Sequence, residues 1–367
     1  MDPYSVDIAA CRSRQARLLE SIAHLDVELV ILSRRESIQW LTGAFVRPPF
    51  APLAAITKAG HLTLVLPERQ LDQPAAVDNL VGYEAKLHST TRDDQEATSA
   101  EVFVKAIARP KHQFACELAT FSSFITFANN CRGIDIDPNI FELRRRKDPD
   151  ELKMLRRANE ANRAMYDRAR QIIAPGLREL DVYAELHKVA VNTLGEPLTY
   201  FGQDFRCGAR GGLPRDRPIE ERELFILDLG VGFRGYHSDN ARTIAVDHEP
   251  TDEQQRAWKA VASIFPIIES RVRPGQSCRQ LFVDIQQELD EYLPWKFNHH
   301  LGHGVGLAPQ EGPHLNPRWD DTFAVGDFLA VEPGLYHDSL RQGIRLEQNY
   351  LVTETGVELW TDWPLGL

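Results

Sequence analysis

The first 130 residues alternate between helix-like and strand-like hydrophobic patterns. The pattern over residues 14–24 predicts a helix, and the compact apolar run at 27–33 predicts a strand after it. Residues 54–58 and 61–66 predict two more strands, because β-branched and apolar residues flank a reversal at Ala59-Gly60. This region is therefore expected to be an α/β domain, and no spacing of titratable residues within it indicates a reaction centre.

A long amphipathic helix is predicted to begin a second domain. The basic run at residues 144–147 leads into Asp148-Pro149, where Asp suits a helix N-cap and Pro suits the first turn. Apolar residues then recur at helical spacing until Pro175-Gly176 ends the helix. This stripe consists of Leu152, Leu155, Ala158, Met165, Ala169 and Ile172. We place the boundary so that the domains are 1–143 and 144–367.

The second domain is predicted to contain an internal duplication. Residues 172–189 and 271–289 share one pattern: a helix that ends at Pro-Gly, a short polar loop, and a second amphipathic helix. Each copy is followed by strands that carry a pair of acids. Two such halves would pack their strands together with helices outside, and a site built by both halves would lie between them.

The first acid pair is Asp228, at the end of an apolar strand, and Asp239, in the next segment. A hairpin reversing at Phe233-Arg234 would set these two residues directly opposite each other. Opposed Cβ atoms lie about 4.5–5.5 Å apart, and two anions at that distance repel unless a cation lies between them. The pair therefore indicates a cation site, although an isolated acid pair is also typical of a solvated strand face.

The second half repeats this arrangement with Glu332 and Glu347, whose odd separation lets both side chains share a face of a second hairpin. Between the pairs lie His299 and His303, followed by closely spaced glycines that allow backbone to approach a ligand. Four carboxylates and an imidazole suit two divalent first-row ions, with Mn or Co favoured and Fe or Zn as alternatives. Two such ions can share a water, lower its pKa and polarise a carbonyl.

Composition narrows the class of protein further. The chain has 42 Lys and Arg against 53 Asp and Glu, a net charge of -11, which argues against nucleic acid or an anionic membrane as the main partner. Its five cysteines form no Cys-x-x-Cys pair, so neither a disulfide framework nor a thiolate zinc site is expected. We find no signal-peptide pattern and no apolar run long enough for a membrane span, and we expect a cytoplasmic protein.

These motifs resemble those of the pita-bread (M24-type) metallopeptidases, which include aminopeptidase P, prolidase, methionine aminopeptidase and the related creatinase. The resemblance runs from about residue 146 to the C-terminus, and the N-terminal domain is similar to the one that precedes the pita-bread unit in prolidase and creatinase. The five ordered motifs of the family appear at Asp228, Asp239, His303, Glu332 and Glu347. The implied fold is an α/β (α+β) creatinase-like domain followed by a pita-bread domain with pseudo-twofold duplication.

The resemblance also implies the role of each residue. Asp228 would bind one metal ion, Asp239 and Glu347 would bridge two, and His303 with Glu332 would complete the second. The implied reaction is attack of a metal-bridging hydroxide on a small peptide bond, with Glu332 accepting a proton and His299 assisting the intermediate. Arg345 would support Glu347 from beside it. Homodimers are common among similar proteins, so we expect one here.

Two family histidines are absent from this chain. One position holds Gln310, and the other holds Arg215 or, by a different spacing, Gly211. The Gln310 amide can still donate, and the Arg215 cation can bind a carboxylate or an oxyanion. We count both as candidate substrate contacts, together with His237, for which a surface position on a strand is the plainer interpretation.

The sequence is compatible with three functions. The favoured one is an Xaa-Pro exopeptidase of the aminopeptidase P or prolidase type. The alternatives are a metal-dependent hydrolase of another amide or amidine C–N bond and a binding or scaffold protein. The segment Gly230-x-Gly232-x-x-Gly235 matches a dinucleotide fingerprint, but strand-like residues follow it, so a Rossmann site is not expected. His300 and His314 are interpreted as loop residues.

Overall fold

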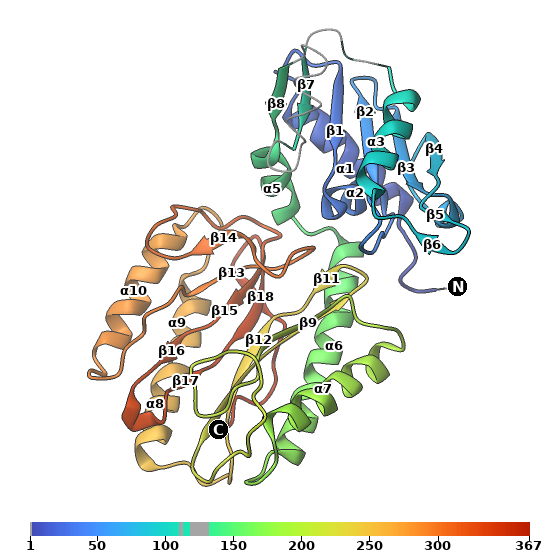
Figure 1. Ribbon diagram of the computed structural model, residues 1–367. Helices are drawn as coiled ribbons and strands as arrows, with labels where there is room; N and C mark the ends of the chain where they lie inside the picture. The colour runs from blue at the N-terminus through green and yellow to red at the C-terminus, as the bar shows by residue number, and fades with distance from the viewer. Residues whose placement is uncertain (1, 109, 111–112, 118–131) are drawn as a thin grey trace. The chain divides into compact units, whose positions relative to one another are not determined.

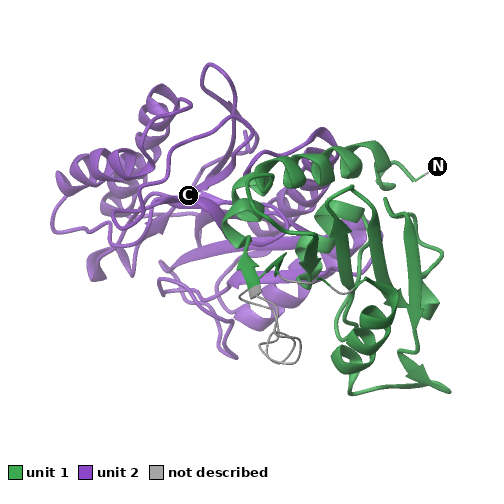
Figure 2. Ribbon diagram, turned by 90° about the horizontal axis from the view of Figure 1, so that it is seen from above, with its two compact units in different colours: residues 1–144 green, residues 145–367 purple. Residues whose placement is uncertain are grey.

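The computed structural model describes residues 2–108, 110, 113–117 and 132–367, and divides into two compact units, Met1–Arg144 and Arg145–Leu367 (Figure 2). No helix among these residues is long and apolar enough to cross a membrane. Four of the described cysteines, at positions 11, 116, 207 and 278, are buried and form no disulfide with one another. Cys131 lies outside the described residues.

The first unit is built on a six-stranded sheet with the order β4-β3-β2-β1-β7-β8. Its strands are β1 (Leu29–Leu32), β2 (Leu53–Thr57), β3 (Leu62–Pro67), β4 (Asn79–Tyr83), β7 (Gln113–Cys116) and β8 (Arg132–Asp135), with a small β5 (Lys86–Leu87) and β6 (Thr90–Thr91) pair beside them. Its helices are α1 (Ile8–Ser21), α2 (Arg35–Thr42), α3 (Gln95–Ala106) and α5 (Asp137–Arg145). The predicted β2–β3 hairpin is confirmed, and Gly60 takes the positive φ of 85° that its turn requires.

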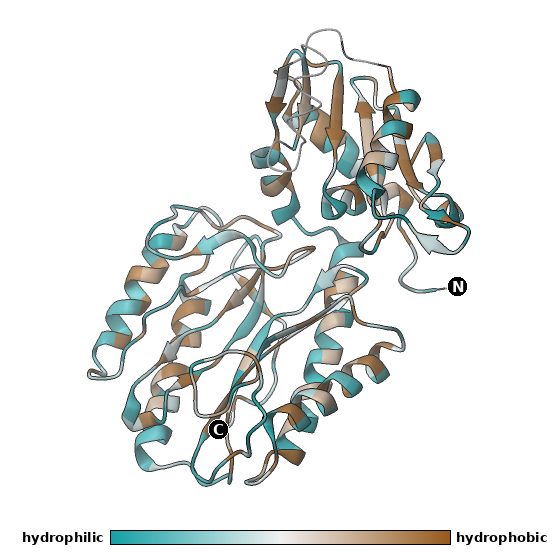
Figure 3. Ribbon diagram, in the orientation of Figure 1, coloured by the Kyte–Doolittle hydropathy of each residue, from teal (hydrophilic) through white to brown (hydrophobic). Residues whose placement is uncertain are grey.

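Alternate residues of the central strands face opposite layers of this unit. Leu29 and Ile31 of β1 pack with Ala55, Val65 and α3 residue Phe103 in one apolar cluster. Figure 3 shows the resulting apolar colouring along β1, β2 and β3.

The second unit contains the predicted duplication, and most of its elements are labelled in Figure 1. The first half comprises α6 (Pro149–Ile172), α7 (Glu179–Leu194), β9 (Tyr200–Asp204), β10 (Leu224–Phe233), β11 (Tyr236–His237) and β12 (Asn240–Ala245). The second comprises α8 (Asp252–Ala262), α9 (Ile264–Arg271), α10 (Cys278–Asp290), β13 (Gly302–Gly304), β14 (Glu311–Leu315), β15 (Phe328–Val331), β16 (Gly334–Leu335), β17 (Ile344–Arg345), β18 (Gln348–Val352) and β19 (Val357–Leu359).

Matching backbone bonds show that the two halves share one design. Gly176 and Gly275 each follow a proline shortly after a helix ends, α6 in the first half and α9 in the second, and both have positive φ, 89° and 83°. The N–H of Gly176 donates to the Ile219 carbonyl and that of Gly275 donates to the Phe323 carbonyl, each at 2.8 Å. One half forms a sheet of β9, β10, β11 and β12, and the other forms the sheet β14-β13-β15-β18-β19. The pseudo-twofold fold expected from the sequence is therefore confirmed.

Candidate metal centre

Three carboxylates meet inside the second unit. Asp228 lies within β10, Asp239 directly precedes β12, and Glu347 directly precedes β18. One oxygen from each lies within 4.8 Å of the others, and all three side chains are buried. Such a group of buried anions requires a compensating positive charge or protonation.

His303 and Glu332 bring the second half of the duplication to the same place. The His303 Nε2 atom lies 3.6 Å from Asp239 Oδ2 and 3.7 Å from Glu332 Oε1. Its Nδ1 atom lies 3.0 Å from the Gly304 carbonyl, which can accept a hydrogen bond from the Nδ1–H group. This hydrogen bond leaves the Nε2 lone pair directed toward the carboxylates, as in a metal-ligating histidine.

The first hairpin has a register different from the predicted one. Asp228 faces Ala241 across the ladder instead of Asp239, because the turn is centred on Arg234-Gly235, with φ values of 48° and 88°. The prediction placed the turn one residue too early, and this shifts the pairing by two. A shift of two keeps every side chain on its original face, so the Asp228 and Asp239 carboxylates still converge.

The second hairpin places its two acids as the sequence predicts. Val331 faces Gln348 and Gly334 faces Arg345, so Glu332 and Glu347 occupy facing positions between these two paired stretches.

Hydrogen bonds from the α6 helix fix the strand that carries Asp228. The Asn162 amide donates to the Leu229 carbonyl at 2.8 Å, and the Tyr166 hydroxyl lies within hydrogen-bond distance of the Leu227 carbonyl, at 3.1 Å, and of the Asn240 carbonyl. The Leu227 and Leu229 carbonyls flank Asp228, and both donors are buried. The backbone on each side of this ligand is therefore tied to the helix.

Two asparagines join the halves reciprocally at the acid cluster. The Asn240 amide donates to the Glu347 carbonyl at 3.0 Å, and the Asn349 amide donates to the Asp239 carbonyl at 2.8 Å. The Glu347 backbone N–H also donates to the Ala241 carbonyl at 3.0 Å. Each half thus positions an acid of the other.

Burial and mutual repulsion raise the pKa of all four acids. Burial is the largest cause in each case, and it raises the pKa of Glu332 to about 8. For Asp239 and Glu347 the neighbouring carboxylates add to the effect. Burial lowers the pKa of His303 to about 4, which keeps its imidazole neutral at neutral pH.

The donor set of this cluster fits divalent metal ions. Asp228 Oδ1 and Glu347 Oε1 are buried without a hydrogen-bond partner among the described residues. Buried charged oxygens without donors are costly unless a cation binds them. Carboxylate oxygens with one neutral imidazole nitrogen are suitable ligands for Mn, Fe, Co or Zn. The residues that would hold the ions are Asp228, Asp239, His303, Glu332 and Glu347.

Arg345 is the cation at the edge of the cluster. Its guanidinium forms ion pairs with Asp228, at 3.0 Å, and with Asp204 of β9. Only 11% of its side chain is exposed. Arg345 therefore supports Asp228 directly, and it lies two residues before Glu347 in sequence.

A histidine and a tyrosine form the wall beside Glu332. The His299 Nε2 atom lies 2.8 Å from the Tyr336 hydroxyl, and its Nδ1 atom lies 2.7 Å from the His300 carbonyl. Burial lowers the pKa of His299 to about 3 and raises that of Tyr336 to about 12. The neutral imidazole therefore accepts a hydrogen bond from a protonated phenol.

The chain matches the model of metallopeptidase family M24 over residues 153–354, more than half of its length. It belongs to metallopeptidase family M24. An Xaa-Pro dipeptidase of Pyrococcus horikoshii is 24% identical over 348 residues, covering 93% of this chain and 94% of that protein. The family model and this match together identify the chain as a metallopeptidase, and therefore as a hydrolase.

Solved structures share the fold of this chain over nearly its whole length. The prolidase of Pyrococcus horikoshii OT3 superposes with a TM-score of 0.81 and 22% identity, covering 96% of this chain and 99% of that one. An X-Pro aminopeptidase of Thermotoga maritima gives a TM-score of 0.79 and 22% identity, covering 96% and 98%.

The candidate substrate contacts have varied surroundings. Arg215 donates to the buried carboxylate of Glu179 at 2.6 and 3.1 Å and to the Cys207 carbonyl at 2.7 Å. Gln310 is exposed, whereas Gly211 lies against the Asp204 carboxylate, which pairs with Arg345. His237 is half-buried, and its backbone N–H donates to the Gly306 carbonyl at 2.9 Å. Through this contact with Asp204, Gly211 lies close to the acid cluster.

Sequence reasoning missed the contribution of β9. Asp204 faces Asp228 across the ladder, and the Gln203 amide lies 3.1 Å from both carboxylate oxygens of Asp239. No motif spacing marks these residues, because only sheet pairing brings β9 beside β10. His300, interpreted from sequence as a loop residue, lies with Nδ1 3.4 Å from Glu332 Oε1.

The glycines of the dinucleotide-like segment have other uses. A Cβ on Gly230 would lie 3.1 Å from the Tyr200 ring, and one on Gly232 would lie 2.9 Å from the Tyr200 Cβ atom. Both glycines therefore make room for Tyr200 on the strand, while Gly235 forms the hairpin turn. The structure agrees with the expectation that this segment is not a Rossmann motif.

Proposed function

We propose that this chain is a dinuclear metal-dependent exopeptidase that hydrolyses small peptides with proline in the second position. The supporting observation is the convergence of four buried carboxylates and the neutral His303 imidazole from both halves of the duplicated domain. The Xaa-Pro dipeptidase among its relatives supports this substrate class. We favour Mn or Co as the bound metal.

Divalent ions in this donor set would supply Lewis acidity and lower the pKa of a coordinated water. In this proposal Glu332 accepts a proton from the attacking water at Oε1, the atom that lies 3.4 Å from His300 Nδ1. His299 and Tyr336 form a neutral polar wall beside Glu332, where they can orient the scissile carbonyl. Arg345 keeps Asp228 and Asp204 together while the substrate binds.

Elemental analysis of protein purified without chelator, followed by assays with Xaa-Pro dipeptides and tripeptides, tests this function. We expect two equivalents of metal, and turnover with added Mn or Co that is lost in Asp239→Asn. Glu354→Gln, at an exposed position, is the matched control and should retain both metal and turnover. A chain that binds no metal would contradict the dinuclear mechanism.

A second candidate is hydrolysis of a different amide or amidine bond on the same metal site. Arg215 lies at a position where the family carries a histidine, and it is bound to Glu179 and the Cys207 carbonyl. The histidine contact to the substrate would therefore be missing at this position, which is the reason to consider a different bond. Two equivalents of metal without Xaa-Pro turnover would favour this candidate over the exopeptidase.

A further inference from the structure

A small cavity in the first unit lies outside the features that the proposed function uses. It has a volume of about 210 Å³ and is lined by Phe50, Pro67, Glu68, Arg69, Gln70, Ala85 and Lys86. This is smaller than the roughly 300–1,000 Å³ of pockets that hold drug-sized ligands, so it suits a small molecule.

Buried hydrogen bonds fix the walls of this cavity. The Ala85 carbonyl accepts from the buried Gln95 amide at 2.8 Å, and Gln95 also accepts from the Tyr83 hydroxyl at 2.9 Å. The Phe50 carbonyl accepts from the Arg35 guanidinium at 2.9 Å. Pro67 is paired with Tyr83 in the parallel β3–β4 ladder. The backbone at Phe50, Pro67 and Ala85 is therefore held in place around the cavity.

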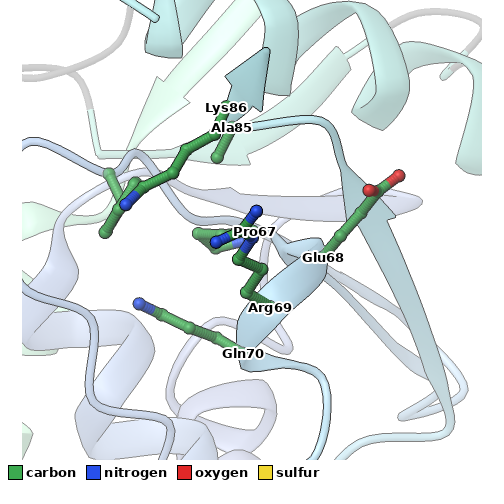
Figure 4. A pocket seen from close by; sticks show the side chains of 7 residues that line it. Pro67, Glu68, Arg69, Gln70, Ala85 and Lys86 are labelled. Carbon is green, nitrogen blue, oxygen red and sulfur yellow. The ribbon is translucent and has the colours of Figure 1, made fainter. Parts of the chain in front are cut away.

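Three nitrogen-bearing side chains converge on the cavity. Figure 4 shows the ends of Arg69, Gln70 and Lys86 directed into the same space. Arg69 donates to the His88 carbonyl at 3.3 Å, and neither Arg69 nor Lys86 pairs with a carboxylate among the described residues. Two cations without an acidic partner, on a chain of net charge -11, form a local attraction for anions.

The one acid in the lining does not neutralise these cations. The carboxylate of Glu68 is directed away from the nitrogen groups in Figure 4. Its Cγ atom would lie 2.9 Å from a Cβ on Gly82, so the stem of this side chain rests against β4.

The remaining wall is apolar and consists of Phe50, Pro67 and Ala85. An apolar wall favours a ligand with an apolar body, and an arginine fork with a nearby ammonium and amide favours a planar carboxylate. We propose that this cavity binds a small organic carboxylate with an apolar or aromatic body. The carboxylate contacts Arg69, Gln70 and Lys86, and the body rests against Phe50 and Pro67.

Isothermal titration with benzoate tests the proposal, with benzamide as the neutral isostere and inorganic phosphate as the anion without an apolar body. We expect saturable binding of benzoate by the full chain, and binding at least about tenfold weaker for both benzamide and phosphate. Phosphate that binds as tightly as benzoate would overturn the carboxylate assignment. Equal binding of benzamide would overturn the role of charge.

Single substitutions locate the binding and separate it from the acid cluster. Arg69→Gln and Lys86→Gln should each weaken benzoate binding about tenfold, because each removes one charged contact. Lys58→Gln, at an exposed position at the other end of the β2–β3 hairpin, should leave it unchanged. Absence of benzoate binding, or binding unaffected by both substitutions, would overturn the proposal. Because the titration measures binding and not turnover, these results are independent of the peptidase assay.

Discussion

Asp204 and Asp228 face each other across the β9–β10 ladder, and the Arg345 guanidinium forms ion pairs with both. This cation comes from β17, in the other half of the duplication. It allows the two aspartates to lie side by side, since two carboxylates in facing positions would otherwise repel each other.

Replacing Arg345 with Met should strongly destabilise the protein. The substitution leaves Asp204 and Asp228 without their shared cation, and loss of one partner from a buried ion pair costs about 3–5 kcal/mol. Urea unfolding of the metal-free protein measures this free energy. The control, Arg163→Gln, removes a surface arginine 4.0 Å from Asp167 and should change stability by less than about 0.5 kcal/mol. A loss below about 1 kcal/mol for Arg345→Met would contradict this role.

Arg215→Met should lower stability without raising the KM for a peptide. Arg215 donates twice to the fully buried side chain of Glu179, so its removal leaves that carboxylate with fewer donors. We expect a loss of about 1–3 kcal/mol in the free energy of unfolding, measured in urea. Arg178→Gln, which replaces an exposed arginine at the N-cap of α7, should have a much smaller effect. A raised KM with unchanged stability would instead indicate a substrate contact.

Tyr336→Phe should reduce kcat with little change in KM. The substitution removes the hydroxyl that donates to His299, so the imidazole loses its fixed orientation beside Glu332. We expect kcat to fall about tenfold or more, since loss of a positioning contact misaligns the reacting groups. Tyr292→Phe, at an exposed position, should retain wild-type kinetics. A kcat equal to that of the wild type would show that this hydrogen bond has no part in turnover.

The stability of the metal-free protein should depend on pH through Glu332. Its pKa is raised to about 8 in the folded chain, from an ordinary value of 4.5, so between these values the folded state binds the proton more tightly than the unfolded state. This contribution is fully present below pH 4.5 and is lost as pH rises toward 8.

Urea unfolding of chelator-treated protein at pH 5 and pH 8.5 measures this effect. Glu332→Gln should lose less stability than the wild type between the two values, by about 1–3 kcal/mol. His299 and His303 act in the opposite direction and at lower pH, because burial lowers their pKa values to about 3 and about 4. If the wild type and Glu332→Gln change equally, Glu332 does not titrate in this range.

The metal-ligand candidates could be identified from sequence because each lies in a short motif. The face of the first hairpin was predicted although its register was not: Arg234 and Gly235 both take positive φ, which moved the turn centre by one residue. An error of two in register preserves the side-chain face, whereas an error of one would have separated Asp228 from Asp239.

The surroundings of the ligands could not be predicted in the same way. Gln203 and Asp204 reach the cluster through pairing of β9 with β10, and Arg345 reaches Asp204 across 141 positions of sequence. Such contacts depend on the assembled fold and leave no periodic signal. Arg215 is another example, since its ion pair with the buried Glu179 carboxylate leaves no signal in the sequence.

The reciprocal bonds of Asn240 and Asn349 have a consequence for the order of folding. Neither half alone can fix the positions of its metal-ligand candidates, because each asparagine binds the backbone of an acid in the opposite half. Closing the chain between such distant segments is entropically costly and so belongs to a late stage of folding. Tight metal binding should therefore require the completed domain. A nascent chain that ends before the second half should bind the metal ions only weakly.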